Sequence, residues 1–262
     1  HSTSRRQRQM CIRDRMPQVS TGAVEFRHVS FGYSPEHQLM HDVNITVKSG
    51  QKVAIVGPTG AGKTTLINLL MRFYDVDGGS ILVDGVDTKE MTRHELRDRF
   101  GMVLQDAWLF EGSIRDNIAY AQDNLPEEKI IAAARSASVD SFIKTLPGGY
   151  DFELSTGAEN ISQGQRQLLT IARAMASDPE IMILDEATSN VDTHTEQLIQ
   201  KALAKLMHGR TSFVIAHRLS TIRDADMILY MEHGDILEHG SHEELMAQHG
   251  KYEALYMSQF AQ

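Results

Sequence analysis

The sequence predicts an α/β fold with a mostly parallel core sheet, helices on both faces, a small antiparallel β subdomain near the N-terminus and an inserted α-helical subdomain. Three observations support this prediction: apolar strands alternate with helical segments in both halves of the chain, the first strands alternate apolar and polar residues, and residues 105–176 have an almost wholly helical pattern. Strands that alternate with helices are typical of parallel sheets. We therefore expect a core of residues 17–104 and 177–262, with the helical subdomain 105–176 between its two halves.

The first half of the core contains several strands and two helices. Residues 24–29 and 43–47 alternate apolar and polar side chains, as half-buried strands do. The capping box Thr92-Arg93-His94-Glu95 starts a helix that we expect to end near residue 100. The other expected elements are strands 52–56, 81–83 (after the turn Gly78-Gly79) and 101–104, and a helix over 64–72.

The second half returns to strands after the helical block. Within that block, Pro126 followed by two glutamates is typical of a first helical turn, and Pro147-Gly148-Gly149 interrupts the pattern. The expected strands are 181–184, 212–216, 227–231 and 235–238, with His233-Gly234 as the hairpin turn between the last two; Ser241 caps a helix, and a last helix begins near Lys251.

Composition limits the classes of function. The 262 residues suffice for one large domain with a sizeable core. A net charge of −9 with scattered Lys and Arg argues against a nucleic-acid-binding face, which needs a basic stripe. The single cysteine, Cys11, excludes an intrachain disulfide and fits a reducing compartment. Since no apolar run reaches the length of a membrane helix, another polypeptide segment must span the bilayer if the protein acts at a membrane.

The first residues differ in character from the rest of the chain. Residues 1–15 are rich in Arg and Gln, lack periodicity and hold the only cysteine. They read as a disordered basic tail or as a targeting peptide, although the latter would need an apolar core. We favour a third interpretation, in which residues 5–14 resemble translated sequencing-adapter sequence. Residues 1–16 are then a non-native or disordered segment, and the natural chain is cut before Met16.

A glycine-rich stretch after the strand 52–56 has the spacing of a phosphate-binding loop. The phosphate loop reads Gly57-Pro58-Thr59-Gly60-Ala61-Gly62-Lys63-Thr64 and fits G-x-x-x-x-G-K-[ST] between a strand and a helix. Glycines let backbone N–H groups surround phosphates at a helix N-terminus. We expect Lys63 to reach the β- and γ-phosphates and Thr64 to bind Mg²⁺. A chance glycine turn would lack these flanks, so a nucleoside triphosphate site is expected.

Two acidic residues end the buried strand 181–184. Asp185 can hold Mg²⁺ through water, and Glu186 follows beside the same metal, where a general base would polarise an attacking water. Pairs of Asp and Glu are also common on protein surfaces. Their position at the end of an apolar strand favours the metal and general-base roles instead.

A third motif lies between these two. The signature loop, Ile161-Ser162-Gln163-Gly164-Gln165, precedes a helix, and with the phosphate loop and Asp185-Glu186 it makes residues 24–260 resemble the nucleotide-binding domain of an ATP-binding cassette (ABC) transporter. The resemblance implies a P-loop NTPase (RecA-like) fold, with ATP and Mg²⁺ bound. It further implies that Ser162, Gln163, Gly164 and Gln165 contact the γ-phosphate held by a second nucleotide-binding domain, in a head-to-tail dimer.

The resemblance also assigns roles to single residues. Tyr33 matches the aromatic residue that stacks on adenine, with a core tyrosine as the alternative. Gln105 matches the glutamine that senses Mg²⁺ and the attacking water, and the alternative is an exposed loop amide. Thr65 adds to the phosphate contacts. Asp192 matches the acid of the loop that crosses to the partner, and it can also cap the next helix. His217 matches the histidine that contacts the γ-phosphate, against the alternative of a structural histidine.

Two further stretches resemble the exporter branch. Residues 106–118 resemble the region that meets the coupling helices of the transmembrane domain, and residues 73–79 indicate the same branch. Exporters of this kind carry the membrane domain before the ATPase on one chain, so a truncated gene product is expected; a separately encoded ATPase subunit is the alternative. The site of action is then the cytoplasmic face of the cell membrane.

The signature loop departs from the family pattern at one position. Gln163 stands where the family usually has glycine. Either the side chain points away and is tolerated, or the chain pairs with a different subunit, so that its intact Lys63, Glu186 and His217 form the hydrolysing site and Gln163 faces a weaker one. We favour the second interpretation.

These residues predict an ATP hydrolase in which Glu186, His217 and Gln105 lie at the reacting phosphate. The energy of hydrolysis would then drive transport. Two other classes of protein are the alternatives. A soluble ABC protein of translation or DNA repair would need paired cassettes or a coiled-coil insertion and a more basic surface. A degenerate regulatory domain that binds ATP without hydrolysis would not need Glu186 and His217.

Overall fold

The computed structural model describes residues 21–34, 36–104, 106–120, 122, 124–185, 191–216 and 218–260. The chain divides into two compact units, residues 1–100 with 210–262 as the first and residues 101–209 as the second. The subdomain boundaries expected at 104–105 and 176–177 stay a prediction.

An antiparallel sheet forms one part of the first unit. Its strand order is β2-β1-β4-β5. The strands are β1 (Val24–Ser34), β2 (His37–Val47), β4 (Gly78–Val83) and β5 (Val86–Asp87). The first two strands are longer than the sequence predicted, because register shifts along β1 break the strict alternation of apolar and polar residues.

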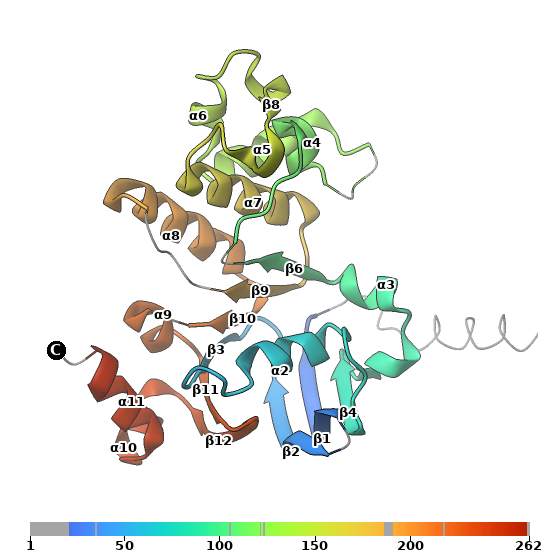
Figure 1. The fold of residues 1–262 in the computed structure, drawn as a ribbon, viewed down its shortest axis with the longest axis vertical. Coiled ribbons are helices and arrows are strands. Elements are labelled where there is room, and N and C mark those ends of the chain that lie inside the picture. Colours follow the sequence, from blue (N-terminus) through green and yellow to red (C-terminus); the bar gives the residue numbers. More distant parts are fainter. Residues whose placement is uncertain are drawn as a thin grey trace, which may run out of the picture. The chain divides into compact units, whose positions relative to one another are not determined.

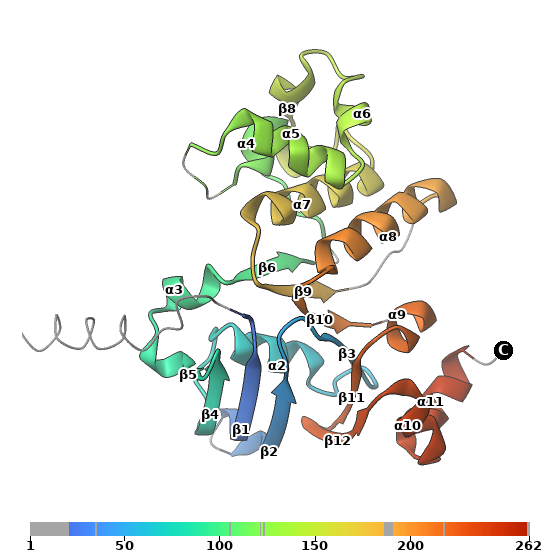
Figure 2. The same ribbon diagram turned by 180° about the vertical axis from the view of Figure 1, so that it is seen from behind.

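Parallel strands form the other part of the first unit. β3 (Lys52–Val56) pairs in parallel with both β10 (Thr211–Ile215) and β11 (Met227–Glu232), and β12 (Asp235–Gly240) is antiparallel to β11. The helices of this unit are α2 (Lys63–Leu70), α3 (Arg93–Arg97), α9 (Leu219–Arg223), α10 (His242–Ala247) and α11 (Lys251–Phe260), with the 3₁₀ turn η1 (Thr88–Glu90). In both views α10 and α11 lie beside β11 and β12 (Figure 1, Figure 2).

The second unit contains most of the longer helices and four short strands. Its helices are α4 (Ile114–Ile118), α5 (Glu127–Ser136), α6 (Asp140–Ile143), α7 (Gln163–Ser177) and α8 (Thr193–Met207), with the 3₁₀ turns η2 (Gly149–Asp151) and η3 (Thr156–Ala158). The strands are β6 (Phe100–Val103), β7 (Gly112–Ser113), β8 (Glu153–Leu154) and β9 (Ile181–Asp185). α7 is central: it contacts α4, α5 and α8, and its residues Leu168, Leu169 and Ile171 are buried. Among the helices of the described chain, none is long and apolar enough to cross a membrane.

The α/β class with parallel core strands and an N-terminal antiparallel sheet is confirmed. The expectation of an almost wholly helical block is wrong in part. β7 and β8 pair across that block, and residues 104–111 contain no regular element among those described. Two-residue strands are too short to show a period of two, so the sequence carries no signal for them.

A buried ion pair closes the turn between β4 and β5. Asp84 has φ 51°, and its carboxylate accepts from the backbone N–H groups of Thr21 and Ala23 at 3.2 and 3.0 Å. Its other oxygen lies 2.9 Å from Arg99 Nη1, and the two side chains are 2% and 12% exposed. This pair ties the start of β1 to the chain after α3.

Replacing Asp84 should therefore cost stability. We expect Asp84→Ala to lower the free energy of unfolding by roughly 3–5 kcal/mol, because it removes the carboxylate partner of a buried guanidinium. Asp98→Ala is the control: Asp98 is 61% exposed in its pair with His94, and its loss should stay within about 0.5 kcal/mol. Urea unfolding of both variants checks this. Equal effects of the two substitutions would show that the buried pair of Asp84 and Arg99 adds no more to the free energy of unfolding than an exposed pair does.

Candidate functional site

The phosphate loop joins the buried strand β3 to α2. Three of the four residues before Gly57 are fully buried, which holds the start of the loop in place. Gly57 and Gly62 have φ of 146° and 98°, conformations that favour glycine. The loop therefore makes its reversal with residues that can take this backbone shape.

The turn between β11 and β12 lies against one side of the phosphate loop. A Cβ on Gly57 would meet the carbonyl oxygen of Met231 at 2.1 Å, and a Cβ on Gly62 would meet Gly234 Cα at 3.0 Å. The N–H of Gly234 donates to the carbonyl of Ala61 at 2.9 Å. The sequence predicted the turn at His233-Gly234, but its supporting role rests on a contact between distant parts of the chain and was missed.

The N-terminus of α2 faces this loop with positive charge. Its N-cap is Gly62, which has no side chain to cap the helix, and the first turn reads Lys63-Thr64-Thr65 without an acidic residue. The Lys63 ammonium donates to the carbonyls of Gly57 and Pro58 at 2.8 and 2.9 Å. An uncapped helix N-terminus with an ammonium above it is a site for an anion such as phosphate.

Tyr33 lies at the same place. Its hydroxyl is 3.0 Å from the Thr65 hydroxyl at the start of α2. The ring is 57% exposed, so the alternative of a core tyrosine is wrong. Phe31 and Tyr74 meet it edge to face, with centroids 5.0 and 5.2 Å away. A ring held at its edges by two others keeps its orientation and leaves a face for a flat ligand.

In the second unit, the signature loop leads into α7 through a reciprocal cap. The Ser162 hydroxyl accepts from the N–H of Gln165 at 3.2 Å, while the Gln165 side chain accepts from the N–H of Ser162 at 2.9 Å. This capping box fixes the loop at the helix N-terminus. Its S-x-x-Q spacing is the signal in the sequence that predicts such a cap.

The two residues inside this cap have opposite surroundings. Gly164 is buried, and a Cβ on it would meet Thr195 Cγ2 at 2.3 Å and Val191 Cγ1 at 3.1 Å. Gln163 is exposed, in the first turn of α7. The helix therefore requires glycine at position 164 for packing and leaves position 163 open to substitution.

The acidic residues of the second unit lie at element ends. Asp192 is the N-cap of α8 and accepts from the N–H of Thr195 at 3.0 Å, so the expected capping role is confirmed. Backbone hydrogen bonding from Thr195 holds the pKa of Asp192 below its usual range, so this carboxylate is charged at neutral pH. Asp185 ends β9 after four buried residues and is itself half-buried.

Three expected site residues, Gln105, Glu186 and His217, lie outside the described residues, and their roles stay predictions. Apart from Asp185 at the end of β9, the described ones fall into two groups. Tyr33 and residues 57–65 meet in the first unit, while the signature loop and Asp192 meet around Thr195 in the second.

An exposed aromatic cluster follows β6 in the second unit. Trp108 and Tyr120 are 60% and 48% exposed, and their rings pack with Phe110. The Arg173 guanidinium lies 4.8 Å from the Tyr120 ring centroid and donates to the carbonyl of Asn117 at 2.8 Å. The three rings thus form an exposed apolar surface that packs against the hydrogen-bonded guanidinium of Arg173.

Comparison with known proteins places these motifs in a family. A family model described as "ABC transporter" matches residues 40–189. The chain is 54% identical over 242 residues to the uncharacterized ABC transporter ATP-binding protein YfiC of Bacillus subtilis (strain 168), covering 92% of this chain and 40% of that protein. It is 55% identical over 232 residues to a fatty acid ABC transporter ATP-binding/permease protein of Mycobacterium bovis, covering 88% of this chain and 37% of that protein.

A solved structure agrees with the sequence relatives. A bacterial Atm1-family ABC exporter with ATP bound matches with a TM-score of 0.85 and 41% identity, over 94% of this chain and 43% of that one. The chain spans about two-fifths of the length of these relatives. The predicted P-loop NTPase fold is confirmed by this match.

The signature loop geometry predicts unequal effects of two neighbouring substitutions. We expect Gly164→Ala to lower the free energy of unfolding by about 1–3 kcal/mol, because the new methyl group overlaps Thr195. Gln163→Ala, at the exposed neighbour, is the matched control and should change it by less than about 0.5 kcal/mol. Denaturant unfolding measures both. The packing argument is wrong if both variants unfold at the same denaturant concentration.

Proposed function

This chain belongs to the ABC transporter family, and on that premise we propose that it binds ATP, hydrolyses it and uses the reaction to drive transport across a membrane. The observation that supports this best is the phosphate loop with Lys63 above it, backed by the β11–β12 turn. The curated relatives are longer than this chain, so the transport step is proposed for the whole protein, of which this is the ATP-binding part.

ATP binds along the start of α2. The β- and γ-phosphates replace the carbonyls of Gly57 and Pro58 as partners of the Lys63 ammonium, and backbone N–H groups of residues 59–65 complete the cradle. The adenine stacks on the exposed face of Tyr33. Such stacking contributes roughly 1–3 kcal/mol to the free energy of binding, and it does not distinguish adenine from other bases by their hydrogen-bonding edges.

Hydrolysis is a transfer of the γ-phosphoryl group to water. Glu186 accepts the proton of the water as its oxygen attacks the γ-phosphorus, the bond to the β,γ-bridging oxygen breaks, and ADP leaves with that electron pair. Gln105 orients the water, and His217 donates a hydrogen bond to the γ-phosphate. These three residues are the catalytic residues of the proposal.

The described donors suit a magnesium ion. Thr64 is exposed at the second position of α2, and Asp185 ends β9 half-buried, so a hydroxyl and a carboxylate oxygen are present, the ligand types that Mg²⁺ prefers. Gln105 is the third proposed ligand. When bound with ATP, Mg²⁺ would supply positive charge that offsets the negative charge of the phosphate groups.

A second nucleotide-binding domain completes the site. The signature loop, from Ser162 to Gln165, offers the N-terminus of α7 to the γ-phosphate on the partner's phosphate loop. Asp192 belongs to the loop that crosses to the partner. ATP therefore joins two domains head to tail, and hydrolysis lets them separate.

A transmembrane domain converts this motion into transport. We assign its coupling helices to the aromatic cluster of Trp108, Phe110 and Tyr120, whose exposed apolar surface is supported by Arg173. The direction is export, and the ATPase works at the cytoplasmic face of the cell membrane. The solved relative, described as an exporter, supports this choice.

The partner domain is a different subunit. Gln163 is exposed at the N-terminus of α7, so its side chain protrudes where the family has a bare glycine. We assign the hydrolysing site to this chain's Lys63 and Glu186 with the partner's signature loop, and a weaker site to Gln163.

The general-base role of Glu186 has a direct test. Glu186→Gln should lower the ATP turnover of the full-length transporter by roughly 10²–10⁴-fold, because the amide cannot accept the proton of the attacking water. ATP binding, measured by filtration with labelled nucleotide, should be unchanged. Normal turnover in this variant would reject the role, and lost binding would reveal a folding defect.

The unequal pairing has a test in the full-length chain expressed without any other subunit. We expect Gln163→Gly to raise its ATPase rate at least about tenfold, because positioned donors to developing phosphate charge contribute up to 10²–10³-fold. Gln248→Gly, at a position next to neither motif, controls for glycine itself. If the unaltered chain alone already hydrolyses ATP at full transporter rates as a homodimer, the pairing proposal is wrong.

A further inference from the structure

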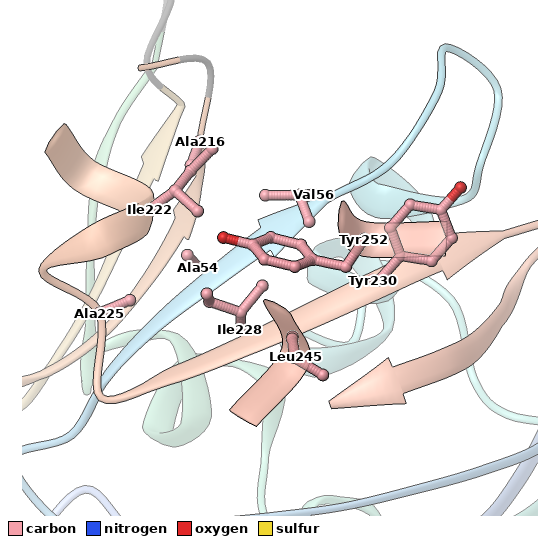
Figure 3. Close-up of a cluster of buried hydrophobic side chains, with 9 residues drawn as sticks. All are labelled: Ala54, Val56, Ala216, Ile222, Ala225, Ile228, Tyr230, Leu245 and Tyr252. Atoms are coloured by element: carbon pink, nitrogen blue, oxygen red, sulfur yellow. The ribbon is translucent and has the colours of Figure 1, made fainter. Parts of the chain in front are cut away.

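A buried cluster connects the C-terminal helices to the end of β10 (Figure 3). All its members lie in the first unit, and each is at most 8% exposed. The members are Ala54, Val56, Ala216, Ile222, Ala225, Ile228, Tyr230, Leu245 and Tyr252. They come from β3, β11, α9 and its flanks, α10 and α11.

Tyr252 of α11 is the largest side chain among the fully buried residues. Figure 3 shows its ring pointing away from α11 toward Ile222 and Ala216. Its hydroxyl is 2.7 Å from Nδ1 of His242 on α10. The ring therefore fills the space beside α9 while its hydroxyl is satisfied by α10.

The protonation states suit this bond. Burial, with a smaller contribution from Arg223, lowers the pKa of His242, and burial raises the pKa of Tyr252 to about 12. At neutral pH the phenol is thus protonated and the imidazole neutral, and the tautomer of His242 decides which of the two groups donates. Glu243 acts on His242 in the opposite direction and less strongly.

β12 holds α11 at its N-terminus. The Glu238 carboxylate accepts from the N–H groups of Lys251 and Tyr252 at 2.7 and 3.0 Å. The Lys251 ammonium lies 2.6 Å from Glu232 at the end of β11. A carboxylate at a helix N-terminus satisfies donors that the helix leaves open, so the position of Tyr252 is set by the strands rather than by α11 alone.

The chain between β10 and α9 is short. β10 ends at Ile215, α9 begins at Leu219, and the cluster members Ala216 and Ile222 stand on either side of His217 in the sequence. We propose that Tyr252 is a positioning residue for hydrolysis, which acts by holding Ala216 and Ile222, the cluster members that flank His217 in the sequence. This rests on the proposed function, in which His217 contacts the γ-phosphate.

The inference is tested by ATPase kinetics of the full-length transporter. Tyr252→Ala should lower kcat about 10- to 100-fold with KM for ATP unchanged, because a small displacement of a contact to the reacting phosphate slows the chemical step without weakening nucleotide binding. Tyr252→Phe, which keeps the ring, should fold and retain most of the activity. Tyr230→Phe is the matched control, since it removes a hydroxyl from another tyrosine of the same cluster, and it should leave kcat unchanged.

A double-mutant cycle with His217→Ala separates positioning from general damage. In the His217→Ala background, Tyr252→Ala should cause no further loss in single-turnover hydrolysis. An equal loss in both backgrounds, or a raised KM in place of a lowered kcat, would overturn the inference while leaving the proposed function intact. If His217→Ala itself leaves kcat unchanged, the proposed role of His217 fails, and the inference fails with it.

Discussion

The close backbone approach between the phosphate loop and the β11–β12 turn is the constraint on which the nucleotide site depends. Gly57 meets the carbonyl of Met231, Gly62 meets Gly234, and a Cβ on Gly234 would lie 1.8 Å from the carbonyl oxygen of Leu39 on β2. These contacts leave no room for side chains. The phosphate loop, the β11–β12 turn and β2 thus pack backbone against backbone. Such close packing fixes the shape of the loop more firmly than contacts between flexible side chains could.

The same strand serves two sides of the first unit. Tyr230 of β11 belongs to the C-terminal cluster, whereas the next residue, Met231, contacts the phosphate loop: a Cβ on Gly62 would meet Met231 Cε at 3.7 Å. Successive side chains of a strand point to opposite faces. β11 therefore contacts the phosphate loop, which carries Lys63, on one side and the C-terminal cluster, which packs against α9, on the other. The antiparallel sheet adds a third connection, because β1 carries Tyr33 and His41 of β2 lies 2.8 Å from Asp235 at the start of β12.

The sequence predicted those parts of the fold that depend on local patterns. The apolar strand before Gly57, the glycines and the helix that starts at Lys63 lie next to one another in the chain, so spacing alone identifies the phosphate loop. The turn at His233-Gly234 was predicted, but its contact with Ala61 was not, because no local pattern encodes an approach across more than 150 residues. The pair β7–β8 was missed because its two-residue strands are too short to show a period of two. The positive φ of His28 and Gly79 marks where β1 and β4 depart from simple alternation.

The two central residues of the signature loop, Gln163 and Gly164, are subject to different physical constraints. In the sequence, Gln163 is the notable feature of this loop, since the family usually has glycine there. Within this chain, however, the glycine that packing demands is Gly164, where Thr195 and Val191 leave no space for a methyl group, whereas Gln163 is exposed. The capping box of Ser162 and Gln165 holds the loop whichever residue stands at 163. Packing within the unit therefore does not decide between glycine and glutamine at position 163, and in the proposed dimer the partner surface opposite the N-terminus of α7 would decide it.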